Sequence, residues 1–293
     1  MLKMLFRLNF LVVIVTMVTN NQYMLYYICA MHTFWFLSVY AMMRPFEQYN
    51  DLRKVMYLKF LLYFLIVFFI FDVQRVGSTV FAPFTPVLSY KGSLHEWLFR
   101  SSLDHYSTFV GMLCAYFHPN LEKTLHCIKG KQFEKITVVS VVFALLSLNY
   151  IWYSKVFVLQ KYDYNKLHPY TSWIPIVSYI VLRNINPWLR RHHMNLFAYL
   201  GKMSLETYIA QLHVYLQLDA KALLVYIPEY PLLNFSLNTF IYLVISQLLF
   251  NATGVLNEYL FPAESKKIVR NAVIITSWIS FCYISTLVLR NIS

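Results

Sequence analysis

The sequence has 293 residues, of which 59% are hydrophobic and 18% aromatic, while only 13% are charged. A soluble domain carries about 25% charged residues because its surface faces water, so this composition excludes a soluble globular protein. The formal net charge is +12, but the sequence contains no run of basic residues long enough to bind a nucleic-acid phosphate backbone. We therefore expect no nucleic-acid partner and attribute the charge to basic loops at a membrane surface.

Long apolar segments recur along the whole chain. A helix needs about 20 mostly apolar residues to cross the hydrocarbon core of a bilayer. The expected spans are Leu5–Thr19, Tyr23–Met43, Val55–Phe71, Leu103–Phe117, Ile136–Trp152, Tyr170–Leu182, Leu196–Leu218, Leu233–Phe250 and Ile268–Leu289. The sequence therefore predicts an all-α, polytopic integral membrane helix bundle of about nine or ten transmembrane helices. We expect residues 1–293 to form a single domain embedded in the lipid bilayer.

The distribution of basic residues predicts the orientation of these spans. One set of helix ends holds Lys3, Arg7, Arg44, Arg53, Lys54, Lys123, Lys129, Lys131, Lys135, Arg183, Arg190, Arg191, Lys266, Lys267 and Arg270. The opposite set is poorer and holds Arg75, Lys91, Arg100, Lys155, Lys161, Lys166, Lys221 and Arg290. Cytoplasmic loops carry an excess of Lys and Arg. We therefore expect the first set, with the N-terminus, to face the cytoplasm.

Ionisable residues interrupt the predicted span Leu196–Leu218. On one continuous helix, Lys202, Glu206 and His213 share a face, with Gln211 on a neighbouring face. Lys202 and Glu206 have the i,i+4 spacing of an ion pair, which lowers the cost of burying both charges. A neutral imidazole accepts a proton from a hydroxyl nucleophile near neutral pH. His213 is therefore a candidate catalytic base, and equally a candidate for a histidine that only bridges helices by hydrogen bonds.

A second charged pattern leads into the span Leu103–Phe117. Glu96, Arg100 and Asp104 repeat every four residues, which predicts a charged ladder on one face of the entering helix. Arg100 between two acids suits an anchor for an anionic group. A salt-bridge ladder at the membrane interface explains the same pattern, and both interpretations stay open.

Motifs of one known family occur in order along most of the chain. The matching segments are Met1–Phe10, Lys91–Arg100, Leu103–Tyr106, Phe109–Leu113, Leu167–Tyr170, Ile180–Ile185, Leu196–Glu206 and Gln211–His213. With them the chain resembles the ten-transmembrane acyltransferase family, which includes animal sialic acid O-acetyltransferases and enzymes of fungal capsule and plant wall acetylation.

The resemblance implies a multi-pass Golgi membrane O-acetyltransferase domain. Its donor substrate is cytosolic acetyl-CoA, and its acceptor is a hydroxyl of a luminal sugar or sugar nucleotide, with sialic acid expected and no metal. Carried over to this chain, the catalytic residues are His213, Glu206, Lys202 and Gln211. The substrate-binding residues are Arg100, Asp104, Glu96 and His105.

The chain departs from the family pattern at several positions, including His105, Val110 and Leu212, and in its domain content. After Arg100 the family usually has Trp and a basic residue, whereas this chain has Ser101 and Ser102, which predicts a weaker grip on an anion. In the family a luminal serine-hydrolase-like domain precedes the membrane domain, and we find no counterpart of it here. We therefore expect a fragment, or a membrane half that works with a separate luminal domain. The alternatives are an acetyl-delivering transporter, a non-catalytic subunit or an inactive relative.

Overall fold

The computed structural model describes residues 2–21, 23–73, 75–85, 93–128, 134–217, 222–262 and 264–292. Within these ranges the chain is helical apart from turns and a single β-bridge between Leu216 and Leu223, which confirms the all-α prediction. The helices are α1 (Leu2–Thr19), α2 (Tyr27–Met43), α3 (Arg53–Phe71), α4 (Val76–Phe81), α5 (Ser93–Ser102), α6 (His105–Ile128), α7 (Glu134–Trp152), α8 (Lys161–Thr171), α9 (Trp173–Ile185), α10 (Pro187–Arg191), α11 (Asn195–Lys202), α12 (Ser204–Val214), α13 (Pro231–Leu260) and α14 (Ser265–Ile292). Short 3₁₀ or π turns are η1 (Tyr23–Tyr26), η2 (Glu47–Tyr49), η3 (Ala82–Phe84) and η4 (Tyr153–Phe157).

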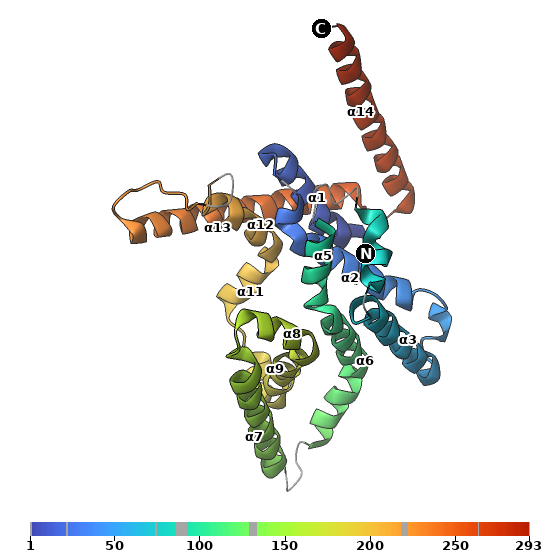
Figure 1. Cartoon of the computed structure of the whole chain (residues 1–293), viewed down its shortest axis with the longest axis vertical. Helices are drawn as coiled ribbons and strands as arrows, with labels where there is room; N and C mark the ends of the chain where they lie inside the picture. Colours follow the sequence, from blue (N-terminus) through green and yellow to red (C-terminus); the bar gives the residue numbers. More distant parts are fainter. Residues whose placement is uncertain are drawn as a thin grey trace. The chain divides into compact units, whose positions relative to one another are not determined.

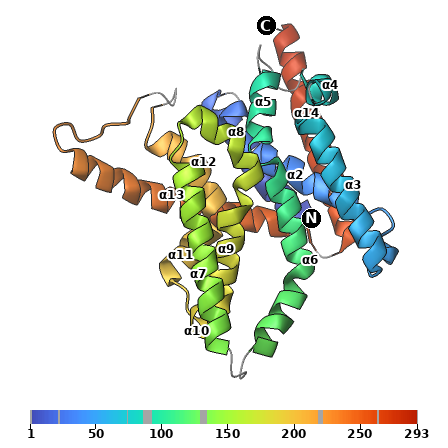
Figure 2. The same cartoon turned by 60° about the horizontal axis from the view of Figure 1, so that its bottom comes forward.

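The chain divides into two compact units. The first combines Met1–Thr33 with Leu196–Ser293, and the second is Phe34–Asn195. In the first unit, α1 and α12 pack against the long helix α13 (Figure 1). In the second, α3 packs against α6, and α7 lies alongside α9 (Figure 2). Whether residues 1–293 act as a single domain stays a prediction.

Several helices have the length and apolarity of membrane spans. Within the described ranges, four meet both criteria, namely Tyr23–Met43, Arg53–Phe71, Ile136–Phe157 and Pro231–Leu260. The apolar helix α9 is shorter. In Ile136–Phe157 the most apolar window is 0% buried within the protein. Such a helix leaves its apolar side chains for lipid to cover, as expected of a polytopic membrane protein.

The predicted span Leu196–Leu218 is not one continuous helix, so that expectation was wrong. Helix α11 ends at Lys202 and α12 begins at Ser204, while Met203 between them has φ −109° and ψ 24°. The Met203 N–H donates to the Leu200 carbonyl at 3.2 Å, which tightens the last turn of α11. The break therefore places Lys202 on a different helix from the residues that follow.

A buried lysine joins α3 to the segment before it. Lys59 is only 8% exposed, although it lies in an otherwise apolar helix. Its Nζ donates to the carbonyls of Met43 (3.1 Å) and Pro45 (2.6 Å) and to Asn50 Oδ1 (2.6 Å). The last carbonyls of a helix lack partners inside the helix. Lys59 therefore caps the end of α2, and those oxygens offset the desolvation of its ammonium.

Helix α4 approaches the end of α3 closely at Gly77. A Cβ atom added to Gly77 would lie 2.6 Å from the Ile70 carbonyl oxygen and 3.2 Å from Leu98 Cδ2. The first of these neighbours is backbone and cannot rotate away. A residue without Cβ is therefore required where α4 meets α3.

We expect Gly77→Ala to destabilise the protein by about 1–3 kcal/mol, because the added methyl group overlaps a fixed carbonyl oxygen. Gly111→Ala in α6 is the matched control, since its Cβ would meet nothing within 4 Å. Thermal unfolding of the full chain in lipid nanodiscs measures both. Equal midpoints for the two variants would contradict the close approach of α4 to α3.

Candidate functional site

A fully buried carboxylate lies at the centre of the first unit. The Glu206 side chain on α12 is 0% exposed. Arg7 on α1 donates from Nε to Oε1 at 3.2 Å and from Nη2 to Oε2 at 2.9 Å. Thr253 on α13 donates its hydroxyl to Oε1 at 3.1 Å. One carboxylate thus links α1, α12 and α13 through hydrogen bonds that its charge strengthens.

Arg7 takes the place that the sequence assigned to Lys202. Arg7 Nη2 also donates to the Lys202 carbonyl at 2.5 Å, at the C-terminal end of α11, where a cation is favourable. Its guanidinium lies 5.0 Å from the centre of the Phe250 ring. The Lys202 side chain is exposed, and the described part of the chain shows no ion pair for it. The expected pairing of Lys202 with Glu206 is therefore wrong.

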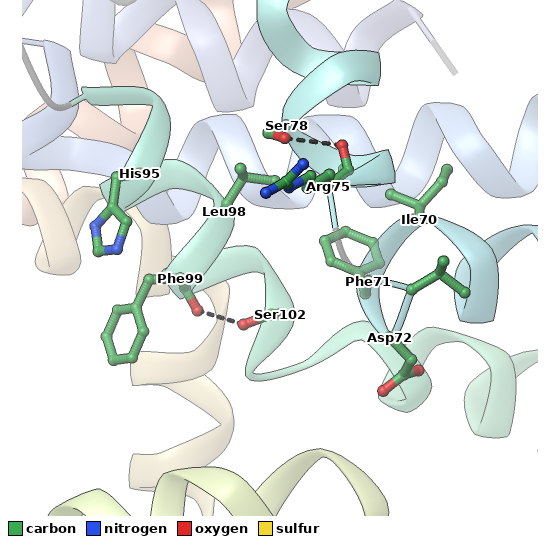
Figure 3. Close-up of a pocket in the computed structure, with 11 residues that line it drawn as sticks. Ile70, Phe71, Asp72, Arg75, Ser78, His95, Leu98, Phe99 and Ser102 are labelled. Atoms are coloured by element: carbon green, nitrogen blue, oxygen red, sulfur yellow. Dashed lines mark hydrogen bonds between the residues drawn. The ribbon is translucent and has the colours of Figure 1, made fainter.

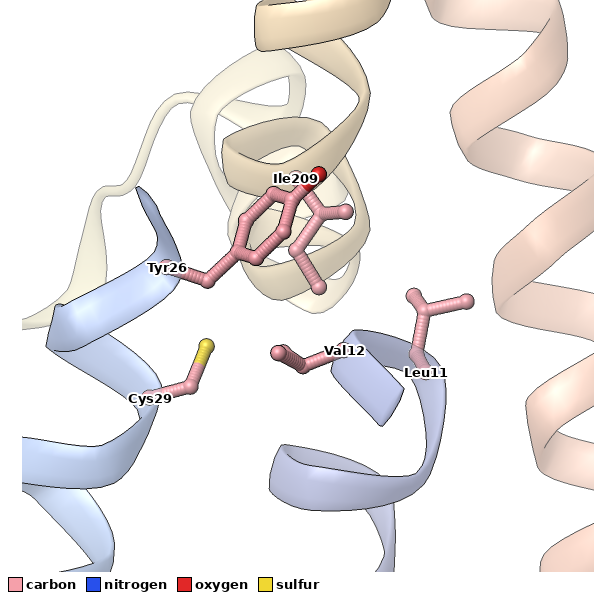
Figure 4. Close-up of a cluster of buried hydrophobic side chains, with 5 residues drawn as sticks. All are labelled: Leu11, Val12, Tyr26, Cys29 and Ile209. Carbon is pink, nitrogen blue, oxygen red and sulfur yellow. The ribbon is translucent and has the colours of Figure 1, made fainter. Parts of the chain in front are cut away.

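His213 lies on α12 with Glu206 and contacts the start of α2. Its Nε2 is hydrogen-bonded to the hydroxyl of Tyr26 in η1. Tyr26 is fully buried in an apolar cluster with Leu11, Val12, Cys29 and Ile209 (Figure 4). His213 itself is half-buried. The structure therefore holds the imidazole through one ring nitrogen, at the edge of an apolar cluster.

The four expected catalytic residues separate into two pairs. Glu206 is buried and His213 half-buried on α12, seven positions apart and hence on one side of the helix. Lys202 and Gln211 are exposed. Only the first pair contributes side chains to the interior of the unit. No feature of the sequence marked Tyr26 or Arg7 as their partners.

A second polar cluster surrounds Asp72, directly after α3 in the second unit. Tyr106 donates its hydroxyl to Asp72 Oδ2 at 2.7 Å, and Tyr170 donates to Oδ1. Nε2 of the buried His105 lies 3.3 Å from Oδ2, although without the angle of a hydrogen bond. His105 Nδ1 faces the Ser102 carbonyl at 2.5 Å. The Asp72 carboxylate is therefore surrounded by two tyrosine hydroxyls and the edge of one imidazole ring.

The expected ladder of charges forms only in part. Arg100 donates to Glu96 Oε1 from Nε at 2.9 Å and from Nη2 at 2.7 Å, which confirms their i,i+4 pairing. Asp104 lies beyond the end of α5, in the turn before α6, and its Oδ1 is 3.5 Å from His168 Nε2. The prediction that Asp104 continues the ladder on the same helix is wrong. His105 belongs instead to the Asp72 cluster.

A cleft of about 350 Å³ borders the Asp72 cluster, between the end of α3, α4 and α5 (Figure 3). Its polar lining consists of Asp72, Arg75, Ser78, His95 and Ser102. The rest of the lining is mainly apolar, as is usual in small-molecule sites. The sequence interpretation missed Asp72 and used Arg75 only for orientation. The signal was present, since both are charged residues directly after an apolar span.

Comparisons with known proteins identify relatives of this chain. Residues 1–273 match a family model described as the 10 TM acyl transferase domain found in Cas1p. The chain is also 33% identical over 279 residues to the N-acetylneuraminate (7)9-O-acetyltransferase of Danio rerio. That alignment covers 90% of this chain but 35% of the relative, so the chain spans about a third of that protein's length. No solved structure matches.

We expect Arg7→Leu to destabilise the protein by about 3–5 kcal/mol, because it leaves the buried Glu206 carboxylate without a counter-charge. The double variant Arg7→Leu/Glu206→Leu should recover much of the loss, since neither charge is then unpaired. Lys202→Ala is the control and should change little. Thermal unfolding in nanodiscs measures the stability of each variant. A large loss of stability with Lys202→Ala but none with Arg7→Leu would contradict the pairing of Arg7 with Glu206.

Proposed function

Because this chain belongs to the family of 10 TM acyl transferase domains, we propose that it is the membrane domain of an O-acetyltransferase, a single unit over residues 1–293. It transfers acetyl from acetyl-CoA to a hydroxyl of a sugar or sugar nucleotide in the Golgi membrane. The name of the zebrafish relative supports sialic acid as the acceptor. The acceptor, the donor and the location are all part of the proposal.

The observation that carries the proposal is the contact between His213 and Tyr26. A histidine acts as a base only through the ring nitrogen that lacks a proton, and a hydrogen bond at the other nitrogen fixes which one that is. If Nε2–H donates to the Tyr26 hydroxyl, the lone pair lies on Nδ1. We assign this tautomer, so Nδ1 is the proton acceptor.

In the proposed step, Nδ1 of His213 removes the proton of the acceptor hydroxyl as its oxygen attacks the acetyl carbonyl carbon. A carbon–oxygen bond forms, the thioester carbon–sulfur bond breaks, and the imidazolium returns its proton to the leaving thiolate. General base assistance of this kind contributes about 10²–10⁴-fold to a rate.

Other residues of the first unit support this step. Glu206 has a positioning role, because its bonds to Arg7 and Thr253 fix α12 and thereby His213. Lys202 is exposed near a predicted cytoplasmic end, which suits the phosphates of acetyl-CoA. Gln211 is exposed near His213 and is proposed as a substrate contact.

The residues that the sequence assigned to substrate binding are proposed to contact the acceptor. Asp104, His105 and the Glu96–Arg100 pair would make these contacts, as expected from the sequence. A luminal serine-hydrolase-like domain is the proposed partner, as the family resemblance implies. If the acetyl group passes to that domain, this chain is the acetyl-delivering half of the enzyme.

We expect His213→Ala to lower kcat for acetyl transfer at least 100-fold, consistent with loss of a general base. Membranes that contain the chain are assayed with labelled acetyl-CoA and CMP-sialic acid, with and without an added luminal serine domain. Gln211→Ala, on the exposed face of α12, tests the proposed substrate contact and should mainly raise KM while leaving kcat near that of wild type. Tyr26→Phe should lower kcat less, because it removes only the bond that fixes the tautomer.

The outcomes distinguish the alternatives. Product from the chain alone supports a complete catalytic site in the membrane domain. Product only with the luminal domain assigns the chain to acetyl delivery. Wild-type activity in the His213→Ala variant would contradict the proposed role of His213 as the general base.

A further inference from the structure

The cleft between α3, α4 and α5 is lined by a cation, Arg75, that the proposed function has not used. Arg75 and His95 line it, together with the apolar side chains of Leu98 and Phe99 (Figure 3). Its volume of about 350 Å³ falls in the range of small-molecule sites. A cation beside apolar walls suits a ligand that has both an anionic group and a carbon ring.

Arg75 is unusual in both backbone and charge. Its φ of 69° places a residue with a Cβ in the left-handed region, which costs roughly 1–2 kcal/mol. The structure records no ion pair for its guanidinium within the described ranges, whereas Arg44 pairs with Glu47 and Arg100 with Glu96. A strained conformation that presents an unpaired cation to a cleft indicates a binding role.

The other polar groups of the cleft do not compete for an anion. Ser78 and Ser102 donate their hydroxyls to the carbonyls of Arg75 and Phe99 at 2.8 Å each. The Asp72 carboxylate points away from Arg75 in Figure 3 and accepts the hydrogen bonds of its tyrosine partners. Repulsion from Asp72 is therefore weakened at the side of the cleft that Arg75 lines.

We propose that this cleft binds an oxyanion of the acceptor, a carboxylate or a phosphate, through Arg75, with His95 as a further polar group of the same lining. The proposal deepens the proposed function and rests on it for the identity of the ligand. It moves the anion-binding role expected of Arg100 to Arg75, because Arg100 is already held by Glu96.

The acceptor is favoured over the donor by the expected orientation. Arg75 belongs to the poorer set of basic residues, predicted to lie on the luminal side. The phosphates of acetyl-CoA arrive from the cytosol, whereas the sugar acceptor is luminal. A carboxylate on the sugar also matches the two parallel N–H donors of a guanidinium.

The test is direct binding of N-acetylneuraminate, CMP-N-acetylneuraminate and CoA to the full chain in nanodiscs, measured by equilibrium dialysis with labelled ligand. The methyl ester of N-acetylneuraminate is the neutral control ligand. Arg75→Gly is the main variant, because Gly accepts the positive φ without strain and keeps the fold. Arg53→Gln, at the opposite end of α3, is the control variant.

We expect Arg75→Gly to weaken binding of the anionic sugars about tenfold to a hundredfold, as loss of a charge-assisted hydrogen bond predicts. The methyl ester should bind wild type and variant alike, and Arg53→Gln should bind as wild type does. A loss confined to CoA would overturn the acceptor assignment. Equal binding of the anionic sugars by wild type and Arg75→Gly, or no binding by wild type, would overturn the proposal.

Failure of the proposed function has a different signature. In one outcome, the wild-type chain forms no acetylated product while Arg75→Gly still abolishes binding of the anionic sugars. That result would leave the anion site intact and overturn only the proposed function. If the Arg75→Gly variant acetylates the acceptor at the wild-type rate and with unchanged KM, the protein has the proposed function but not the proposed anion site. A melting temperature of Arg75→Gly equal to or above that of wild type excludes misfolding as the cause of any loss.

Discussion

The first unit is arranged around the charge of a single carboxylate. Glu206 has no contact with solvent, and a buried carboxylate is tolerated only when its charge and lone pairs are compensated. Arg7 provides that compensation from a position 199 residues earlier in the chain, and Thr253 adds a donor from α13. The position of α12 is thereby fixed against α1. The contact of His213 with Tyr26 depends on that position.

The carboxylates of Glu206, which is 0% exposed, and Asp72, which is 14% exposed, differ in how they are compensated. Glu206 is paired with a permanent cation, which favours one rigid arrangement of helices. Asp72 accepts hydrogen bonds from the hydroxyls of Tyr106 and Tyr170, and the imidazole Nε2 of His105 lies 3.3 Å from its Oδ2. Neutral hydroxyl donors compensate a carboxylate less strongly than a guanidinium does. In the second unit, this less strongly compensated carboxylate lies beside the cleft.

Composition and apolar periodicity were enough to predict an all-helical membrane protein and the place of most helices. They also identified Glu206 and His213, because charged residues within an apolar span are conspicuous. The pairing of Glu206 was missed, since Arg7 is distant in sequence and its own neighbourhood gives no sign of burial. The break at Met203 was missed because local apolarity is the same on both sides. Tertiary contacts decided both features.

The capping of α2 by Lys59 has a consequence for how the protein enters the membrane. An ammonium on a helix that enters the bilayer alone costs up to about 3 kcal/mol. The oxygens that accept its protons belong to Met43, Pro45 and Asn50, all made before α3 is synthesised. Insertion of α2 and α3 as a preformed hairpin avoids that cost. We therefore expect the insertion machinery to transfer α2 and α3 into the bilayer together rather than one after the other.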